Sequence, residues 1–169
     1  MCRQAAITEE IGAHADYVIG GHLGDLVLDD TGLSNKTPGT LSIDELQDFA
    51  FHKIEKKGRS WLLKNLVEPN SEFQNINDLL HEFTNREFRP LVHIEDYDFR
   101  IKVFKIEQYC FRFTATGFRM YQAAAFPRLP FYDNRLVDFI CSVPTEYVRN
   151  RRLQVDYLKR CAPDLARIP

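Results

Sequence analysis

The stretch RLPFYDNRLVDFICSVP, residues 128–144, carries the clearest structural pattern in this chain. Pro130 fixes its own φ and favours an extended conformation at the residue before it. Asp133 is a suitable N-cap, because its carboxylate can accept from the unpaired N–H groups of a first helical turn. Apolar residues then recur at helical spacing, at Leu136, Phe139, Ile140 and Val143. The stretch therefore predicts a turn followed by a short helix, which Pro144 ends.

A short strand is predicted near the N-terminus. Residues 17–19 (YVI) are aromatic and β-branched, and Gly20 and Gly21 follow them. This composition favours a buried strand whose carboxyl end opens into a loop. A buried strand needs neighbours along its edges, and few other segments here have strand character. We therefore expect the chain to be part of a larger sheet-containing domain.

Most of the remaining chain has helical periodicity. Ser42 and Glu45 form a capping box ahead of a helix that is expected to end near Gly58. A long helix is predicted from Asp96, and its inward face is expected at Phe99, Val103, Ile106, Cys110 and Phe113. Residues 114–117 (TATG) are expected to break it. Further helices are expected over residues 59–67, 75–83, 118–126 and 153–161.

Composition excludes several classes of protein. The chain has 169 residues, of which 44% are hydrophobic and 27% charged, which is typical of one globular unit. A net charge of −2 argues against nucleic acid and anionic membranes as partners. No apolar run approaches bilayer length, and no signal peptide is recognised. The cysteines, at positions 2, 110, 141 and 161, form no C-x-x-C pair, so a reduced, cytoplasmic setting is expected.

Two segments resemble the asparagine synthase family. Residues 15–26 (ADYVIGGHLGDL) are similar to the family's strand followed by S-G-E-G-x-D-E. Residues 112–168 follow the family's C-terminal pattern, including R-x-P-F-x-D-x-x-L-v-x-F-x-x-S-x-P over residues 128–144. The helical middle of the chain fits the family's arrangement but carries no diagnostic residues.

The resemblance implies a fold. Residues 1–169 would be a mostly α-helical fragment, with one or two short parallel strands, of an α/β adenine-nucleotide-hydrolase-like (ATP pyrophosphatase) domain. Residues 1–40 would form the strand and the nucleotide-side loop, and residues 41–169 the helical part of this synthetase domain.

The resemblance also implies an activity, that of a glutamine-hydrolysing, ATP-dependent amide ligase. Family members bind ATP and Mg²⁺ and activate a small carboxylic acid, aspartate in the parent enzyme, as an acyl-adenylate. Pyrophosphate leaves, and ammonia from a separate glutaminase domain then forms the amide. The expected partners are therefore ATP, a carboxylic acid and ammonia.

Four residues take roles from the resemblance. Gly20 and Gly21 match positions whose backbone approaches AMP, where a Cβ would hold the ligand away. Asp25 matches an aspartate that helps to hold Mg²⁺ on the pyrophosphate. His22 stands where the family has a catalytic glutamate, and a neutral imidazole can act as a base near pH 7. The structural alternatives are a plain turn at the glycines, a solvated acid at Asp25 and a polar loop residue at His22.

The chain also departs from the family pattern. Leu26 replaces an acid, and Phe126 replaces a glutamate that usually precedes R-x-P-F, so asparagine itself is in doubt as the product. Two family motifs are not in these residues: S-G-G-x-D-S, which cradles pyrophosphate, and R-x-K, expected shortly after Pro169. We therefore expect the fragment to be inactive alone and prone to associate with itself. The alternative function is a non-catalytic helical interaction module or a degenerate relative.

Three further segments are given structural or incidental roles. Arg128 is expected to pair with a carboxylate and anchor the turn before the helix. Residues 149–152 (RNRR) are expected to form a solvated loop. Cys2 resembles the family's glutaminase nucleophile only in its position, because the expected C-G-I pattern does not follow it.

Overall fold

The computed structural model describes residue 8, residues 10–54 and residues 76–167. Helices dominate this part of the chain, and two strands, β1 (Tyr17–Ile19) and β2 (Phe126–Arg128), form a parallel two-stranded sheet. The prediction of a mostly helical chain with short parallel strands is confirmed. The predicted helix over residues 59–67 and the predicted helix end at Gly58 lie outside the described residues.

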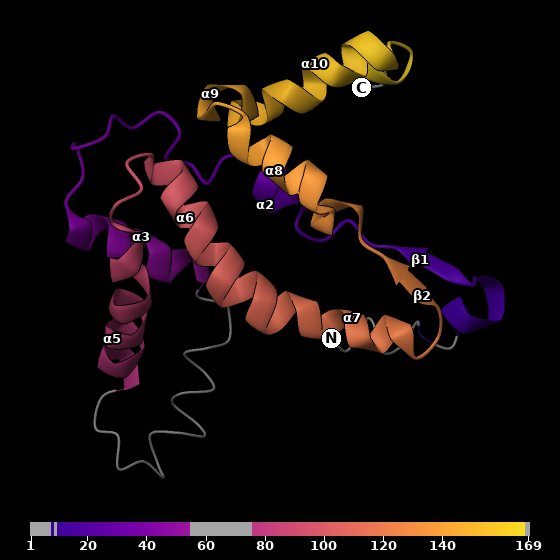
Figure 1. The fold of residues 1–169 in the computed structure, drawn as a ribbon, viewed down its shortest axis with the longest axis horizontal. Coiled ribbons are helices and arrows are strands. Elements are labelled where there is room, and N and C mark those ends of the chain that lie inside the picture. Colours follow the sequence, from indigo (N-terminus) through magenta and orange to yellow (C-terminus); the bar gives the residue numbers. More distant parts are fainter. Residues whose placement is uncertain (1–7, 9, 55–75, 168–169) are drawn as a thin grey trace.

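The two strands come from the two segments that carry the family resemblance. Tyr17 lies opposite Phe126, and Ile19 lies opposite Arg128. Figure 1 shows the pair at one end of the molecule, with β2 between β1 and α7 (Ala115–Gln122). Burial of β1 is incomplete, since Tyr17 is 59% exposed and Ile19 77% exposed, which is what the absence of further neighbouring strands among the described residues predicts. Within the described residues, β1 has a neighbouring strand on one side only.

The helices occur largely where periodicity predicts them. They are α2 (Gly24–Leu28), α3 (Ile43–Ile54), α5 (Ile76–Phe88), α6 (Tyr97–Lys105), α7, α8 (Asn134–Ser142), α9 (Thr145–Val148) and α10 (Arg152–Cys161). The capping box is confirmed, because Ser42 N donates to Glu45 Oε2 at 2.8 Å and Glu45 N donates to Ser42 Oγ at 3.2 Å. The Asp133 cap is also confirmed, since its carboxylate accepts from Arg135 N at 2.9 Å.

One helical run continues from α6 to α7. Residues Ile106–Thr114 join the two helices as a π-helix, and Figure 1 shows a single curved rod. The predicted break at residues 114–117 is therefore wrong, and Gly117 is a buried residue inside α7. The prediction of helix up to Phe126 is also wrong, because that residue lies in β2. No described helix has the length and apolar composition of a membrane span.

The main hydrophobic core lies between α3, α5 and α6. Ile101 and Phe104 are fully buried, whereas the predicted inward residues Phe99 and Val103 are only half-buried. The predicted face of this helix is therefore wrong in α6, because α6 is covered from more than one side. The core consists of Leu33, Leu46, Ala50, Phe88, Leu91, Tyr97, Ile101 and Phe104.

A second core supports the candidate site. It joins α2, the π-helical segment and α8 through Leu23, Leu26, Val27, Cys110 and Ile140. The predicted apolar face of α8 is correct at Ile140, which is buried, but Phe139 is 54% exposed.

Residues 150–152 are exposed, as predicted for a solvated segment, but residues 149–151 also bond to the loop after α2. Arg151 Nε donates to Asp29 Oδ2 at 2.7 Å, and Asn150 N donates to Asp30 Oδ2 at 3.3 Å. The Arg149 guanidinium donates to the hydroxyl and the carbonyl of Ser34. Asn150 and Arg151 have φ of 53° and 58°, in the left-handed region that these contacts stabilise.

Candidate functional site

The candidate site begins where β1 ends. Gly20 N donates to Arg128 O at 2.9 Å, so the sheet extends one residue past the strand. Gly21 O then accepts from Gly24 N at 3.2 Å, and this turn leads into α2. Leu23 completes the turn with φ 74°, and its carbonyl accepts from Leu26 N and Val27 N at 3.0 Å. The chain thus passes directly from the carboxyl end of a parallel strand into a short helix.

The two glycines differ in what surrounds them. A Cβ on Gly20 would lie 3.0 Å from both His22 Nδ1 and Leu129 Cδ2, so the protein's own side chains occupy that space. A Cβ on Gly21 would meet nothing within 4 Å. Gly21 is therefore the position where the backbone is open to a ligand. At Gly20 a small residue is needed for a different reason, because the side chains around it leave little room for a Cβ.

His22 packs as an aromatic ring with one unpaired nitrogen. Its ring meets Phe118 edge to face, with centroids 4.4 Å apart and an interplanar angle of 81°. Nδ1 is buried and has no hydrogen-bond partner among the described residues. A buried nitrogen without a partner costs free energy in the folded state, which a hydrogen bond to a bound group would recover.

His22 and Asp25 line the same pocket, of about 180 Å³. Its remaining lining residues are Leu23, Leu26, Lys105, Tyr109, Cys110 and Thr114. Gly20 and Gly21 do not line it. The structure therefore brings together two of the four predicted site residues and adds a cation, a phenol, a thiol and a hydroxyl. This volume is below the usual range for a complete ligand site.

The π-helical segment explains which of these residues meet. A π-helix bonds each residue to the fifth one along, so residues 105, 110 and 114 project on nearly the same side. An ordinary α-helix would spread them further around its axis. Sequence reasoning found Cys110 only as a core residue and missed Lys105, because a π-helical turn has no recognised sequence pattern.

Cys110 is a buried, protonated thiol at neutral pH. Burial raises its pKa, and the Asp25 carboxylate raises it further, while the Lys105 ammonium opposes the rise. A thiol with a raised pKa is a poor nucleophile. The pocket therefore offers no activated cysteine.

We expect Cys110 to react with iodoacetamide more slowly than the exposed Cys141 and Cys161 in the folded protein. Labelling followed by peptide mass spectrometry measures the order of reaction. The denatured chain, in which all three should react at similar rates, is the control. Labelling of Cys110 as fast as Cys161 under native conditions would contradict this assignment.

Phe131, from the stretch that carries the R-x-P-F pattern, packs on Gly24 at the start of α2. A Cβ on Gly24 would lie 2.8 Å from Phe131 Cε2 and 3.0 Å from Cζ. Contacts this short require the ring or the helix to move. The two segments that resemble the family therefore fit together through a glycine and an aromatic ring as well as through the sheet.

We expect Gly24→Ala to lower the free energy of unfolding by about 1–3 kcal/mol, because overpacking against Phe131 exceeds the gain in helix propensity. Denaturant unfolding followed by circular dichroism measures the change. The matched control is Gly21→Ala, whose new methyl meets nothing within 4 Å and should change stability by less than about 0.5 kcal/mol. Equal effects of the two substitutions would contradict the packing role of Gly24.

Arg128 does not have the predicted carboxylate partner within the described residues. Its guanidinium instead lies over the rings of Tyr17 and Phe126, 5.3 and 5.0 Å from their centroids. These cation–π contacts link β1 to β2 on the exposed face of the sheet. Arg128 therefore anchors the strand pair and not a carboxylate.

Asp25 is the acidic residue of the pocket, at the exposed first turn of α2. No group of three or more His, Cys, Asp or Glu side chains that could hold a metal occurs among the described residues. One carboxylate fits Mg²⁺ only where phosphates and water complete the octahedron, which is the usual arrangement for this ion. Asp25 is therefore suited to a metal that arrives with a nucleotide.

Comparison with known proteins gives no relative: no family model, no curated protein and no solved structure matches this chain.

Proposed function

We propose that these residues form one wall of the active site of an ATP-dependent amide ligase related to asparagine synthase, within an α/β domain of the ATP pyrophosphatase type. One observation carries the proposal. The two segments that resemble the family, far apart in the sequence, meet as parallel neighbours in β1 and β2 and pack again where Phe131 meets Gly24. If the chain is related to this family, the two segments must lie side by side in the fold. Two segments that resembled the family by chance would not need to be neighbours.

The position of the site also supports nucleotide chemistry. In open parallel sheets, ligands bind beyond the carboxyl ends of the strands. Gly21 and Asp25 lie there, and Gly21 has an open side where a ligand can approach the backbone. Gly21 would lie against AMP, and Asp25 would hold Mg²⁺ on the departing pyrophosphate.

The proposed reaction has two steps. A carboxylate oxygen of the substrate attacks the α-phosphorus of ATP, and the bond to pyrophosphate breaks. Ammonia, supplied by a glutaminase domain, then attacks the acyl carbon, and AMP leaves with the carboxylate oxygen. In this proposal His22 would accept the proton that the attacking ammonia must lose; the support for this role is that its Nδ1 has no hydrogen-bond partner among the described residues.

Lys105 adds a positive charge to the pocket that holds His22 and Asp25. A lysine ammonium attracts carboxylate and phosphate groups as a point charge. It would favour an anionic substrate at this position, which is consistent with a carboxylic acid that becomes an acyl-adenylate.

The 169 residues alone should bind Mg-ATP weakly or not at all. Binding needs groups that converge from several sides, because the freedom that the ligand loses must be offset, and Gly21 and Asp25 supply one side only. Calorimetric titration with Mg-ATP measures this. Tight, stoichiometric binding would contradict the placement of these residues as one wall of a larger site.

The proposed function is tested on the polypeptide encoded by the complete reading frame that contains these residues. We expect S-G-G-x-D-S before them and R-x-K after them, and pyrophosphate release that depends on both ATP and a carboxylic acid. Aspartate and a panel of other small acids identify the substrate. A reading frame that contains neither motif would contradict the proposal. So would a product that releases no pyrophosphate with any acid.

The second candidate is a non-catalytic relative that acts through its helices. Leu26 favours it: this residue, at an acidic position of the family pattern, is 5% exposed and packs in the second core. The wall of the pocket at this point is therefore apolar. In the assay above, a product that contains both motifs but stays inactive with every acid would support this candidate.

A further inference from the structure

The outer edge of β1 has unpaired main-chain groups. Phe126 N donates to Asp16 O at 2.8 Å, and Gly20 N donates to Arg128 O at 2.9 Å. Because alternate residues of a parallel ladder face the neighbouring strand, the N–H and C=O of Tyr17 and Ile19 point away from β2. No hydrogen bond reaches them from the described part of the chain. This edge can therefore accept another strand.

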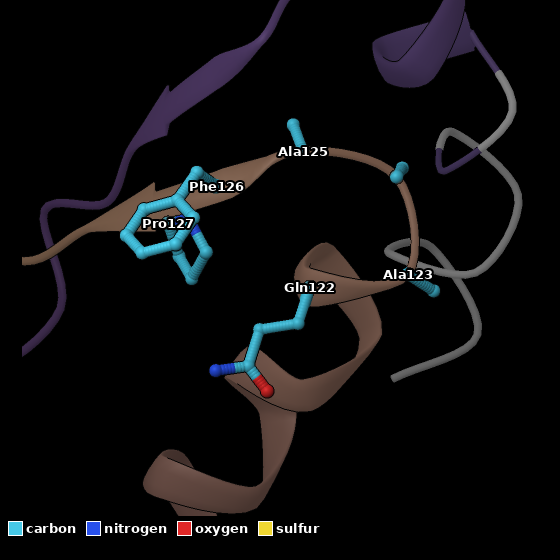
Figure 2. A pocket seen from close by; sticks show the side chains of 6 residues that line it. Gln122, Ala123, Ala125, Phe126 and Pro127 are labelled. Atoms are coloured by element: carbon cyan, nitrogen blue, oxygen red, sulfur yellow. The ribbon is translucent and has the colours of Figure 1, made fainter.

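The outer edge of β2 cannot accept a strand in the same way. By the same alternation, the main-chain N–H and C=O groups of Phe126 and Arg128 face β1, and the main chain of Pro127 faces outward. Proline has no N–H, so it interrupts a ladder on that side. Phe126 and Pro127 line a pocket of about 400 Å³ together with residues 122–125. Figure 2 shows the lining side chains on β2, at the end of α7 and on the loop between them. The described sheet can thus grow at β1 only.

The side chains of β1 favour pairing. Tyr17 and Ile19 are both largely exposed on one face of the sheet. Proteins usually protect an open edge with lysine, proline, an inward charge or a bulge, and residues 17–19 contain none of these. An edge of this kind is a template for association.

We propose that the outer edge of β1 is an interface with a second copy of this chain, in which the two β1 strands pair antiparallel about a two-fold axis at Val18. Each Tyr17 then lies opposite Ile19 of the other copy, and aromatic and β-branched residues are a favourable cross-strand pair. Asp16, the nearest charged residue of the segment, lies opposite Gly20, so like charges do not oppose each other. The edge is therefore complementary to itself.

The pairing closes at two copies. An interface about a two-fold axis uses the same surface on both partners. The combined sheet then ends on each side at β2, where Pro127 faces outward. The result is a dimer and not a fibre. This inference concerns the 169 residues by themselves, because in the larger domain of the proposed function another strand of the sheet would pair with this edge of β1.

Sedimentation velocity over a wide range of concentration tests the proposal. We expect the wild-type chain to shift from monomer to dimer, and Ile19→Pro to remain monomeric. This substitution removes an outward N–H but no bond of the β1–β2 ladder, so the fold should persist. Ile19→Val, which keeps the N–H, is the matched control and should still form dimers. A wild-type chain that stays monomeric, or Ile19→Pro dimers as stable as those of wild type, would overturn the proposal.

Amide hydrogen exchange keeps the test decisive if Ile19→Pro fails to fold. In the wild-type chain, the amides of Tyr17 and Ile19 should exchange more slowly as the protein concentration rises. The exchange rate of the Val18 amide, which faces β2, should not fall together with theirs. Exchange of Tyr17 and Ile19 that does not depend on concentration would overturn the proposal.

Discussion

Replacing Asp98 with alanine should destabilise the protein more than any single change at the candidate site. Asp98 is 0% exposed, and its Oδ1 accepts from Thr31 N at 2.5 Å and Thr31 Oγ1 at 2.7 Å. Its Oδ2 lies 3.0 Å from the Nζ of Lys102, whose side chain is only 9% exposed. The substitution leaves a buried ammonium without its counter-charge and two donors without an acceptor. We expect a loss of about 3–5 kcal/mol in the free energy of unfolding.

Two further variants make this prediction specific. Asp98→Ala combined with Lys102→Met removes both charges and should recover part of the lost stability. Asp164→Ala breaks an exposed pair with Arg167, 3.2 Å apart, and should cost less than about 1 kcal/mol. Urea unfolding followed by circular dichroism compares all three. A loss in Asp98→Ala no larger than that in Asp164→Ala would show that this buried pair does not hold the loop at Thr31 to α6.

Asp25→Asn should remove most of the pyrophosphate release of the complete polypeptide while leaving its fold intact. Asp25 is exposed at the start of α2, so its loss disturbs little packing. Removal of a ligand charge from a metal–pyrophosphate site instead costs transition-state stabilisation. We expect release to fall by about 100-fold or more, because loss even of an indirect metal partner costs up to that much.

The matched control for this variant is Asp16→Asn. Asp16 is an exposed acid just before β1, at the opposite end of the strand from the pocket. Its replacement should leave pyrophosphate release unchanged. Thermal unfolding verifies that both variants are folded. Unchanged release in Asp25→Asn would make Asp25 an ordinary surface acid.

Local rules predicted the elements that local interactions decide. The capping box at Ser42 and the cap at Asp133 depend on neighbours in the sequence and occur as expected. The strand at residues 17–19 also occurs as expected, because its aromatic and β-branched residues favour a strand, although its partner is distant in the sequence. The face of α6 was wrong because the positions of α3 and α5 around it are a tertiary matter. β2 was missed because a three-residue strand containing proline has little strand character of its own and depends on β1 for pairing.

The candidate site was predictable in part for the same reason. His22 and Asp25 are close in sequence, so a turn followed by a helix was enough to bring them to one pocket. Lys105 and Thr114 reach that pocket through a π-helical turn, and Phe131 reaches Gly24 through the pairing of distant strands. Such contacts depend on how elements pack, which a single sequence does not reveal.

The central claim is that a carboxylic acid is activated on ATP as an acyl-adenylate at this site. Its most direct test follows oxygen-18 from a labelled carboxylate substrate in the complete polypeptide, with mass spectrometry of the nucleotide and phosphate products. Because the carboxylate oxygen attacks the α-phosphorus and stays there when ammonia forms the amide, we expect the label in AMP. Label in inorganic phosphate, which an acyl-phosphate would give, or no transfer of label, would contradict the account.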